Sequence, residues 1–300
     1  GGGYWIQRYL RVFSDLMVPS FFALSGYLFY RNYTTEKLLG KLKSRIFSLL
    51  IPYLIWNLAA YLFYQIIRFV PGVTESMNYS GADFSVMDMF ADMLCGGRNV
   101  TWFIRFLLGF CMVAPIAWYC IKTLLLGALS LVLLIVAGMT LNFNFLSYLA
   151  IFLFGGWIGV NWPDKVREKY STRVRCLSLL LLLSTVLAET IYSSTSGGGG
   201  ENLFFRWGQI CLLWIVADNF AVRRPIPPWL KISFFLYVTH SMVLESIEKI
   251  FLICLGRTTL GAWIDLICAP IVTLCIVELT AWLLRRYVPT VWEIVNGGRK

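Results

Sequence analysis

The chain has 300 residues, of which 58% are hydrophobic and 14% are charged, and its formal net charge is +10. Soluble domains average about 45–50% apolar and about 25% charged residues, so this composition excludes an ordinary water-soluble domain and predicts a membrane protein. The basic residues cluster between apolar runs instead of forming one basic face with interleaved aromatics, which argues against nucleic-acid binding.

Nine apolar runs approach the roughly 20 residues that a helix needs to cross the hydrocarbon core. They cover residues 10–30, 46–67, 101–121, 123–140, 143–160, 176–192, 203–220, 232–255 and 263–284. Their length and continuity favour helices over the ten-residue alternating segments of an outer-membrane barrel. The sequence therefore predicts an all-α, polytopic transmembrane helical bundle that forms a single integral-membrane domain over residues 1–300.

The eight cysteines form no CxxC or CxxH pair, and most of them lie in or beside these apolar runs. This usage supports neither a disulfide framework nor a zinc site, so no metal cofactor is expected.

The loops between the runs indicate the orientation, because Lys and Arg accumulate in cytoplasmic loops. Bases crowd residues 31–45, and every second loop from there is also basic, including 161–175 and 285–300. The loop at 68–100 instead holds four acids against two arginines. We therefore expect a multi-pass protein of the plasma (inner) membrane with a cytoplasmic C-terminus and residues 71–99 outside. An odd span count with an external start also leads us to expect a further span before residue 1.

Charged side chains inside the spans are candidate site residues, since each costs about 2.5–3.5 kcal/mol at the bilayer centre on the insertion scale. Those near the span ends are typical of structural residues whose side chains reach the interface. The full set is Arg11, Asp15, Arg105, Glu189, Arg206, Asp218, His240, Glu245, Glu248, Lys249, Asp265 and Glu278.

The run at 232–255 has a polar ridge in which Ser233, Tyr237, Ser241, Glu245 and Glu248 follow one another at helical spacing. Such a ridge should face a protein cavity instead of lipid. The only histidine of the chain, His240, lies beside Ser241. A lone intramembrane histidine is more often a packed, hydrogen-bonded residue than a catalyst, yet it is the one group that could exchange protons near neutral pH. Both interpretations stay open.

The basic segment Lys41, Lys43 and Arg45 precedes the second run. One interpretation is simple anchoring on the cytoplasmic side. The other is a phosphate clamp, because Lys and Arg at a helix entrance can form charge-assisted hydrogen bonds with the phosphates of a nucleotide-like donor.

Four stretches, in this order, resemble motifs of the acyltransferase-3 family of integral-membrane acyltransferases. PSFFALSGYL resembles the "FF, two residues, SG" motif, and KLKSRIFSLLIPYLIW resembles the helix with a basic start and a Pro-Tyr core. TWFIRFLLGFCMVAP is similar to the Trp-Phe-led helix, and SFFLYVTH to the Ser, Tyr, His pattern of the next-to-last helix. FLFGGWIG also fits the middle helices, more weakly. The stretches lie at residues 19–28, 41–56, 101–115, 233–240 and 152–159.

The resemblance implies transfer of an acyl group, often acetyl, from cytoplasmic acyl-CoA to a hydroxyl of a polysaccharide, a lipid-linked sugar or another cell-envelope glycoconjugate. It implies that Lys41, Lys43 and Arg45 hold the phosphates of the donor. Further candidates that would orient or stabilise the reacting groups are Ser25, Arg105, Tyr237 and His240. The family's proposed catalytic histidine lies in a first helix, which we expect upstream of residue 1; alternatively, this chain is a variant without that chemistry, or His240 substitutes as the base.

Two functions of other classes remain. The same polar ridge could line the path of a small-molecule transporter, although no internal repeat is visible. The chain could also be a catalytically inactive membrane-binding subunit of the same fold. Acyl-CoA hydrolysis or acyl transfer would separate the enzyme from both alternatives.

Overall fold

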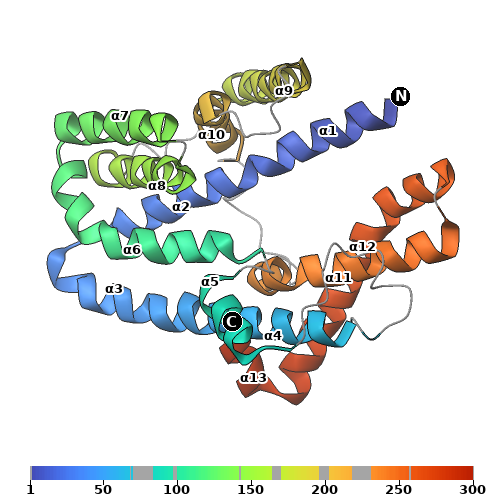
Figure 1. The fold of residues 1–300 in the computed structure, drawn as a ribbon. Coiled ribbons are helices and arrows are strands. Elements are labelled where there is room, and N and C mark those ends of the chain that lie inside the picture. Colours follow the sequence, from blue (N-terminus) through green and yellow to red (C-terminus); the bar gives the residue numbers. More distant parts are fainter. Residues whose placement is uncertain are drawn as a thin grey trace. The chain divides into compact units, whose positions relative to one another are not determined.

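A computed structural model describes residues 2–67, 69, 84–96, 100–141, 143–163, 170–195, 203–217, 231–256 and 258–299. All regular secondary structure in these ranges is helical (Figure 1), which confirms the predicted all-α class for this part of the chain. The helices are α1 Gly2–Asp15, α2 Met17–Tyr30, α3 Leu38–Arg45, α4 Ile51–Ile67, α5 Val86–Cys95, α6 Trp102–Ile121, α7 Leu124–Thr140, α8 Asn144–Asn161, α9 Thr172–Thr195, α10 Leu203–Ala217, α11 Ser233–Leu255, α12 Thr259–Tyr287 and α13 Pro289–Val295. Thr35–Lys37 forms a 3-10 turn, and Ile46–Leu50 forms a π-helix.

Six segments among the described residues are long and apolar enough to cross a membrane. They are Trp5–Tyr30, Thr35–Ile67, Trp102–Ile121, Asn144–Asn161, Thr172–Ser194 and Thr259–Tyr287. Two further predicted spans coincide with the shorter apolar helices α7 and α10, and the run at 232–255 coincides with α11, which carries Glu245, Glu248 and Lys249. The structure thus supports a multi-pass membrane protein, while the count of nine spans stays a prediction.

Some predicted features lie outside the described ranges. These are Asp218, residues 70–83 and 97–99 of the expected external loop, and residues 164–169 of the loop at 161–175.

The chain folds into two compact units, each described by itself below. The first unit comprises residues 1–38 and 109–224, and the second comprises residues 39–108 and 225–300. Helix α6 begins in the second unit and ends in the first. A single domain over residues 1–300 stays a prediction.

In the first unit, α2 packs closely against α8, and glycines permit this approach. A Cβ atom on Gly26 would lie 1.8 Å from the carbonyl oxygen of Phe152, and one on Gly155 would lie 1.8 Å from that of Ala23. Small residues at such seams let helix backbones approach in membranes, where packing replaces the hydrophobic effect as the driving force. The glycines of the SG and FLFGGWIG stretches therefore form a helix–helix contact.

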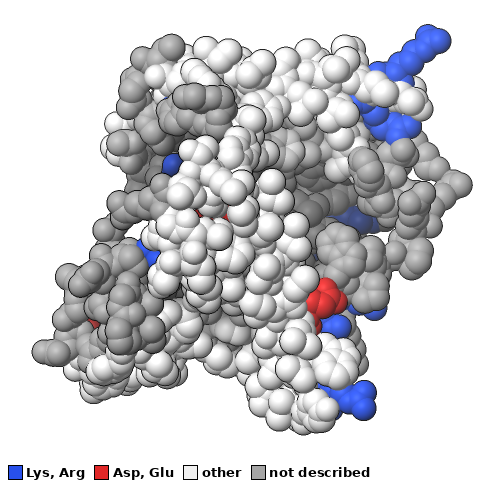
Figure 2. Space-filling model, turned by 90° about the vertical axis from the view of Figure 1, so that its right-hand side faces the viewer, with Lys and Arg blue, Asp and Glu red and all other residues white. Residues whose placement is uncertain are grey.

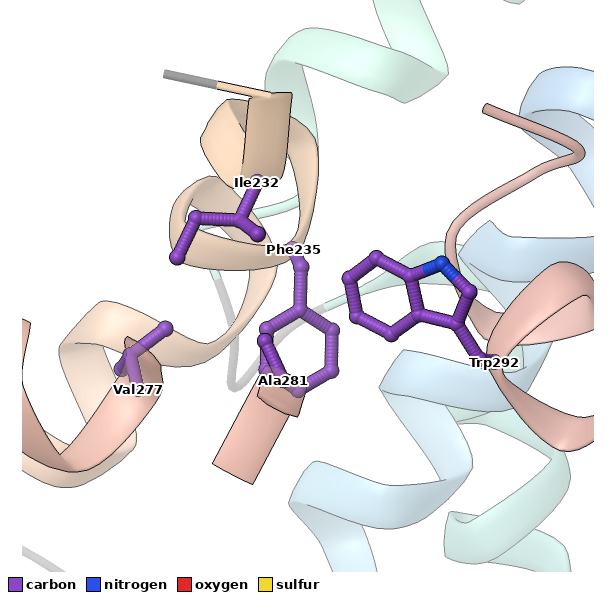
Figure 3. Packing of buried hydrophobic residues seen from close by; sticks show 5 residues of the cluster. All are labelled: Ile232, Phe235, Val277, Ala281 and Trp292. Atoms are coloured by element: carbon purple, nitrogen blue, oxygen red, sulfur yellow. The ribbon is translucent and has the colours of Figure 1, made fainter. Parts of the chain in front are cut away.

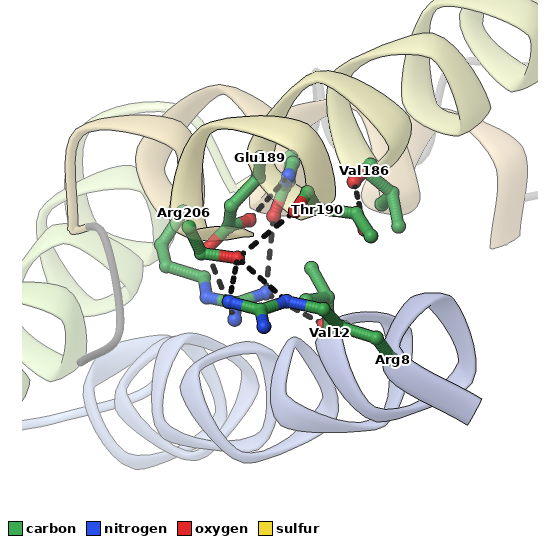
Figure 4. Close-up of polar contacts among 8 residues, drawn as sticks. Arg8, Val12, Val186, Glu189, Thr190 and Arg206 are labelled. Carbon is green, nitrogen blue, oxygen red and sulfur yellow. Dashed lines mark hydrogen bonds and ion pairs between the residues drawn. The ribbon is translucent and has the colours of Figure 1, made fainter. Parts of the chain in front are cut away.

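The first unit also holds a buried ion pair, drawn in Figure 4. Arg206 of α10 and Glu189 of α9 lie 3.3 Å apart, and their side chains are 1% and 3% exposed. Gln209 donates to Glu189 at 3.0 Å, and Arg206 donates to the carbonyl of Val12 in α1 at 2.9 Å. These contacts explain the two intramembrane charges as a pair that ties three helices together.

In the second unit, an apolar cluster joins α11, α12 and α13. Phe235 packs against Trp292 with ring centroids 5.2 Å apart (Figure 3). The cluster is completed by Ile232, Val277 and Ala281. A hydrogen bond of 2.9 Å from the indole nitrogen of Trp56 to the carbonyl of Val295 connects α4 to the end of α13. This packing places the C-terminal residues beside the start of α4.

The outer surface suits a hydrocarbon environment. Figure 2 shows a face on which uncharged side chains predominate and charged ones gather in a few places. Helices α7, α9 and α12 leave large apolar side chains exposed, among them Leu125, Leu180 and Leu260. Exposed apolar area on this scale is rare on soluble monomers and marks surfaces that contact lipid or protein.

Candidate functional site

Helix α5 lies along α4 and is held there by a stripe of polar side chains. Tyr61 donates to the carbonyl of Ser85 at 2.9 Å, Asn57 donates to that of Met93 at 3.3 Å, and Tyr53 donates to that of Leu94 at 2.8 Å. From Tyr61 to Tyr53 the contacts move back along α4 by about 12 Å at 1.5 Å per residue. The segment from 85 to 94 therefore runs antiparallel to α4.

This arrangement changes the interpretation of the loop at 71–99, which we expected to lie wholly outside. Residues 53–61 fall inside the second predicted span, so residues 84–96 fold back beside a membrane helix. Backbone polar groups are tolerated at that depth only where protein groups satisfy them, and the tyrosines and the asparagine of α4 do so for three carbonyls. We therefore describe α5 as a re-entrant helix.

The re-entrant segment delivers the start of α6 to the same stripe. Gly96 ends α5 with a φ of +63°, and a Cβ atom there would lie 2.9 Å from the Thr101 hydroxyl and 3.0 Å from that of Tyr53. Thr101 is fully buried and donates to the amide oxygen of Asn57 at 2.5 Å. The chain can turn here because glycine adopts the left-handed conformation without steric cost.

Tyr237 joins α11 to the start of α6. Its hydroxyl donates to the carbonyl of Val100, and its ring packs edge-on against Phe103, with ring centroids 5.9 Å apart at 76°. Because the hydroxyl proton is already used in this bond, Tyr237 is suited to position α11 and not to donate to a substrate.

His240 lies one turn further along α11, with its ring centroid 6.3 Å from that of Tyr237. Its Nδ1 lies 2.8 Å from the carbonyl oxygen of Tyr237 and 3.2 Å from that of Leu236. Carbonyl oxygens only accept hydrogen bonds, so Nδ1 carries the proton, and in the neutral ring Nε2 has a free lone pair. The half-buried His240 thus has the tautomer of a hydrogen-bond acceptor.

The other predicted site residues are distributed as follows. Arg105 of α6 is exposed, and its guanidinium donates to the carbonyl of Cys95 at the end of α5. Ser25 of α2 belongs to the first unit, next to the packing glycine Gly26. The structure therefore brings Tyr237 and His240 together and places Arg105 on the helix that Tyr237 contacts, whereas Ser25 lies in the other unit.

The basic segment lies on α3 and continues without a break through the π-helix into α4. Lys41 and Arg45 are half-buried and Lys43 is exposed. One turn beyond Arg45, the carbonyl of Ser48 accepts a hydrogen bond of 3.0 Å from Arg299. The position of Pro52 explains this free carbonyl, because the α-helical partner of Ser48 would be residue 52 and proline has no N–H.

Acidic residues of α11 form a separate feature. Tyr64 donates to Glu245 at 2.8 Å, which connects α4 to the polar ridge of α11. No group of three or more His, Cys, Asp or Glu side chains in the described ranges is arranged to hold a metal ion.

The first unit contains a cavity of about 410 Å³. It is lined by Phe154, Ile158, Trp162, Tyr170, Ile210, Cys211, Trp214 and Ile215. The lining is mostly apolar and includes none of the predicted site residues.

Sequence reasoning missed the polar stripe of α4 and the role of Arg299. The stripe was visible as Tyr53, Asn57 and Tyr61 at steps of four residues within an apolar run. Arg299 had no such signal, because its contact with Ser48 joins residues 251 positions apart.

Comparison with known proteins agrees with the motifs. A family model described as an acyltransferase domain, that of the acyltransferase-3 family, matches residues 1–282. The searches found no matching curated protein and no matching solved structure. Since the family model covers most of the chain, this chain belongs to the acyltransferase-3 family of integral-membrane acyltransferases.

Proposed function

We propose that the chain is a membrane-bound O-acyltransferase that moves an acyl group, in the first instance acetyl, from cytoplasmic acyl-CoA to a hydroxyl of a cell-envelope polysaccharide, lipid-linked sugar or other glycoconjugate. The membership in the acyltransferase-3 family supports the reaction class. The orientation follows from the charge distribution of the loops, with the C-terminus in the cytoplasm of a cell whose plasma (inner) membrane holds the protein.

The geometry of His240 is the observation that carries the proposal. Its Nδ1–H bonds to backbone carbonyls of α11 and fix the tautomer. Nε2 then accepts a hydrogen bond from the reacting hydroxyl and draws its proton away while the oxygen attacks the thioester carbonyl. The carbon–oxygen bond forms, the carbon–sulfur bond breaks, and coenzyme A leaves as its thiol. Proton transfer by a positioned group contributes typically about 10²–10⁴-fold.

The remaining residues act around this step. Tyr237 positions α11 against α6 through Val100, so it supports His240 without touching the substrate. Arg105 lies on α6 and has a permanent positive charge, which suits it to stabilise the developing oxyanion. Lys41, Lys43 and Arg45 provide charge-assisted hydrogen bonds for the donor's phosphates. The role of Ser25 is to orient the acceptor.

The test uses the purified chain in lipid nanodiscs with radiolabelled acetyl-CoA and membrane glycoconjugates as acceptors. His240→Asn keeps an N–H at the position of Nδ1 and removes the acceptor at Nε2. We expect it to lower transfer about 100-fold or more while coenzyme A affinity stays within twofold. His240→Gln, whose amide can reach the position of Nε2, should recover part of the activity.

Ser246→Ala is the matched control, because the Ser246 hydroxyl bonds only to the carbonyl of Met242 in the same helix at 2.8 Å. It should retain wild-type transfer. Wild-type transfer by His240→Asn would remove the role of His240. Coenzyme A binding with neither transfer nor hydrolysis would contradict the enzymatic function and favour an inactive binding subunit.

A further inference from the structure

The C-terminal turn, residues 296–299, docks on the π-helix Ile46–Leu50 in a way that the family membership does not explain. Gly297 and Gly298 have φ angles of +65° and +71°, and a Cβ atom on Gly297 would lie 2.5 Å from the carbonyl oxygen of Ser48. Asn296 is fully buried and donates to the carbonyl of Arg299 at 2.7 Å. Glycine and asparagine thus allow the turn to lie directly on the helix backbone.

The turn fixes the guanidinium of Arg299 in one place. Its Nη1 donates to the carbonyls of Ser48 and Asn296, both at 3.0 Å. Its charged carbon lies 3.9 Å above the ring of Phe234 at the start of α11. Such a stacked, hydrogen-bonded arginine has lost most of its conformational freedom before any ligand arrives, which lowers the entropic cost of binding.

Two arginines are thereby brought close together. Arg45 begins the π-helix, and Ser48, which holds Arg299, lies three residues later, one turn along the same face. Burial and then the positive charge of Arg45 lower the pKa of Arg299 to about 10. Within the described ranges, no carboxylate lies within ion-pair distance of either arginine. Like charges held together without a counter-charge are destabilising, and an anion between them would relieve the repulsion.

Two buried polar atoms add to this pattern. The hydroxyl of Ser48 is buried and has no hydrogen-bond partner in the described part of the chain. An unsatisfied buried hydroxyl costs about 1–3 kcal/mol, so it marks a place where a ligand or water is expected. The amide oxygen of Asn296 is also buried without a partner among these residues. As an acceptor, it suits a hydroxyl or amino group of a ligand and not a phosphate oxygen.

We propose that the C-terminal turn and the π-helix together form a phosphate-binding site, in which Arg45 and Arg299 bind the phosphate oxygens and the Ser48 hydroxyl donates to them. The ligand is the phosphate-bearing end of the acyl-CoA donor, which rests on the proposed function. The site then lies at the start of α11, and His240 follows Phe234 by six residues, about 9 Å along the helix axis. The same helix connects the phosphate site to the acyl-transfer site.

Two sources of phosphate have to be distinguished, the donor and the headgroups of anionic lipids. The protein is therefore placed in nanodiscs of phosphatidylcholine alone and titrated calorimetrically with coenzyme A and with inorganic pyrophosphate. Parallel nanodiscs contain phosphatidylglycerol. We expect coenzyme A and pyrophosphate to bind in the zwitterionic nanodiscs, and phosphatidylglycerol to change the coenzyme A affinity less than twofold.

Arg299→Gln should weaken both ligands about tenfold or more, the scale of a lost hydrogen bond to a charged group, and Arg299→Lys should recover part of the loss. Arg45→Gln removes no hydrogen bond between described residues, so it stays informative if the turn of the Arg299 variant is displaced. The double variant should lose less than the product of the two single losses, because both arginines bind one ligand. Arg286→Gln is the control, since Arg286 is exposed at the end of α12 and packs on Trp282.

Unchanged coenzyme A and pyrophosphate affinity in Arg45→Gln and Arg299→Gln would overturn the site. A response to phosphatidylglycerol without binding of either soluble ligand would assign the arginines to a lipid headgroup and also overturn the proposal. The outcome is separable from that of the proposed function. Loss of ligand affinity in the variants of a protein that shows no acyl transfer would uphold the phosphate site and refute the enzyme.

Discussion

The buried pair of Glu189 and Arg206 gives the sharpest test of the first unit. Removing one partner of a buried ion pair costs about 3–5 kcal/mol, because the other charge stays buried and unpaired. In Glu189→Leu, Arg206 keeps its bonds to the carbonyl of Val12 and the side chain of Gln209 but loses its only counter-charge in the described residues. We expect a loss of about 3–5 kcal/mol in the free energy of unfolding.

Arg206→Met should cost less than Glu189→Leu, since a carboxyl group can be buried in its neutral form whereas a guanidinium stays charged. The double variant should be close to wild type, because well-packed apolar residues often replace a buried pair at no cost. Unfolding is followed by circular dichroism in mixed micelles with increasing sodium dodecyl sulfate. Arg173→Leu, an exposed charge on the same helix α9, is the control and should shift stability by less than about 0.5 kcal/mol. Losses that simply add in the double variant would refute the reasoning.

Two further predictions concern packing and topology. Gly155→Ala should destabilise the protein by about 1–3 kcal/mol, since its Cβ would meet a backbone carbonyl, while Gly208→Ala, which has open space, should gain about 0.5–1 kcal/mol; unfolding in the same micelles measures both, and equal effects would contradict the close seam. For topology, single cysteines at Ser80 and Ser171 in a cysteine-free background should differ in labelling by an impermeant thiol reagent added to intact cells, with only Ser80→Cys modified. The native Cys95, retained alone, should resist the reagent because it ends the re-entrant helix, and labelling as fast as at position 80 would place that helix outside.

The sequence by itself determined the class of structure and the family. Continuous apolar runs of about 20 residues admit only membrane helices, since an isolated backbone cannot leave its polar groups unsatisfied in lipid. The helices α2, α4, α6, α8, α9, α11 and α12 therefore fall where the runs predicted them. The motifs from PSFFALSGYL to SFFLYVTH identified the acyltransferase-3 family, which the family comparison confirmed. These are properties of local composition and spacing.

Tertiary structure decided how these elements meet. Nothing local indicated that the loop after α4 turns back, because the tyrosines that hold α5 belong to another helix. Spacing alone placed His240 beside the polar ridge, but only the folded helix fixes which ring nitrogen carries the proton. Arg299 meets Ser48 across 251 residues, since a proline frees one carbonyl and a glycine lets the chain approach it. Contacts between distant residues depend on the packing of whole helices, which no local pattern records.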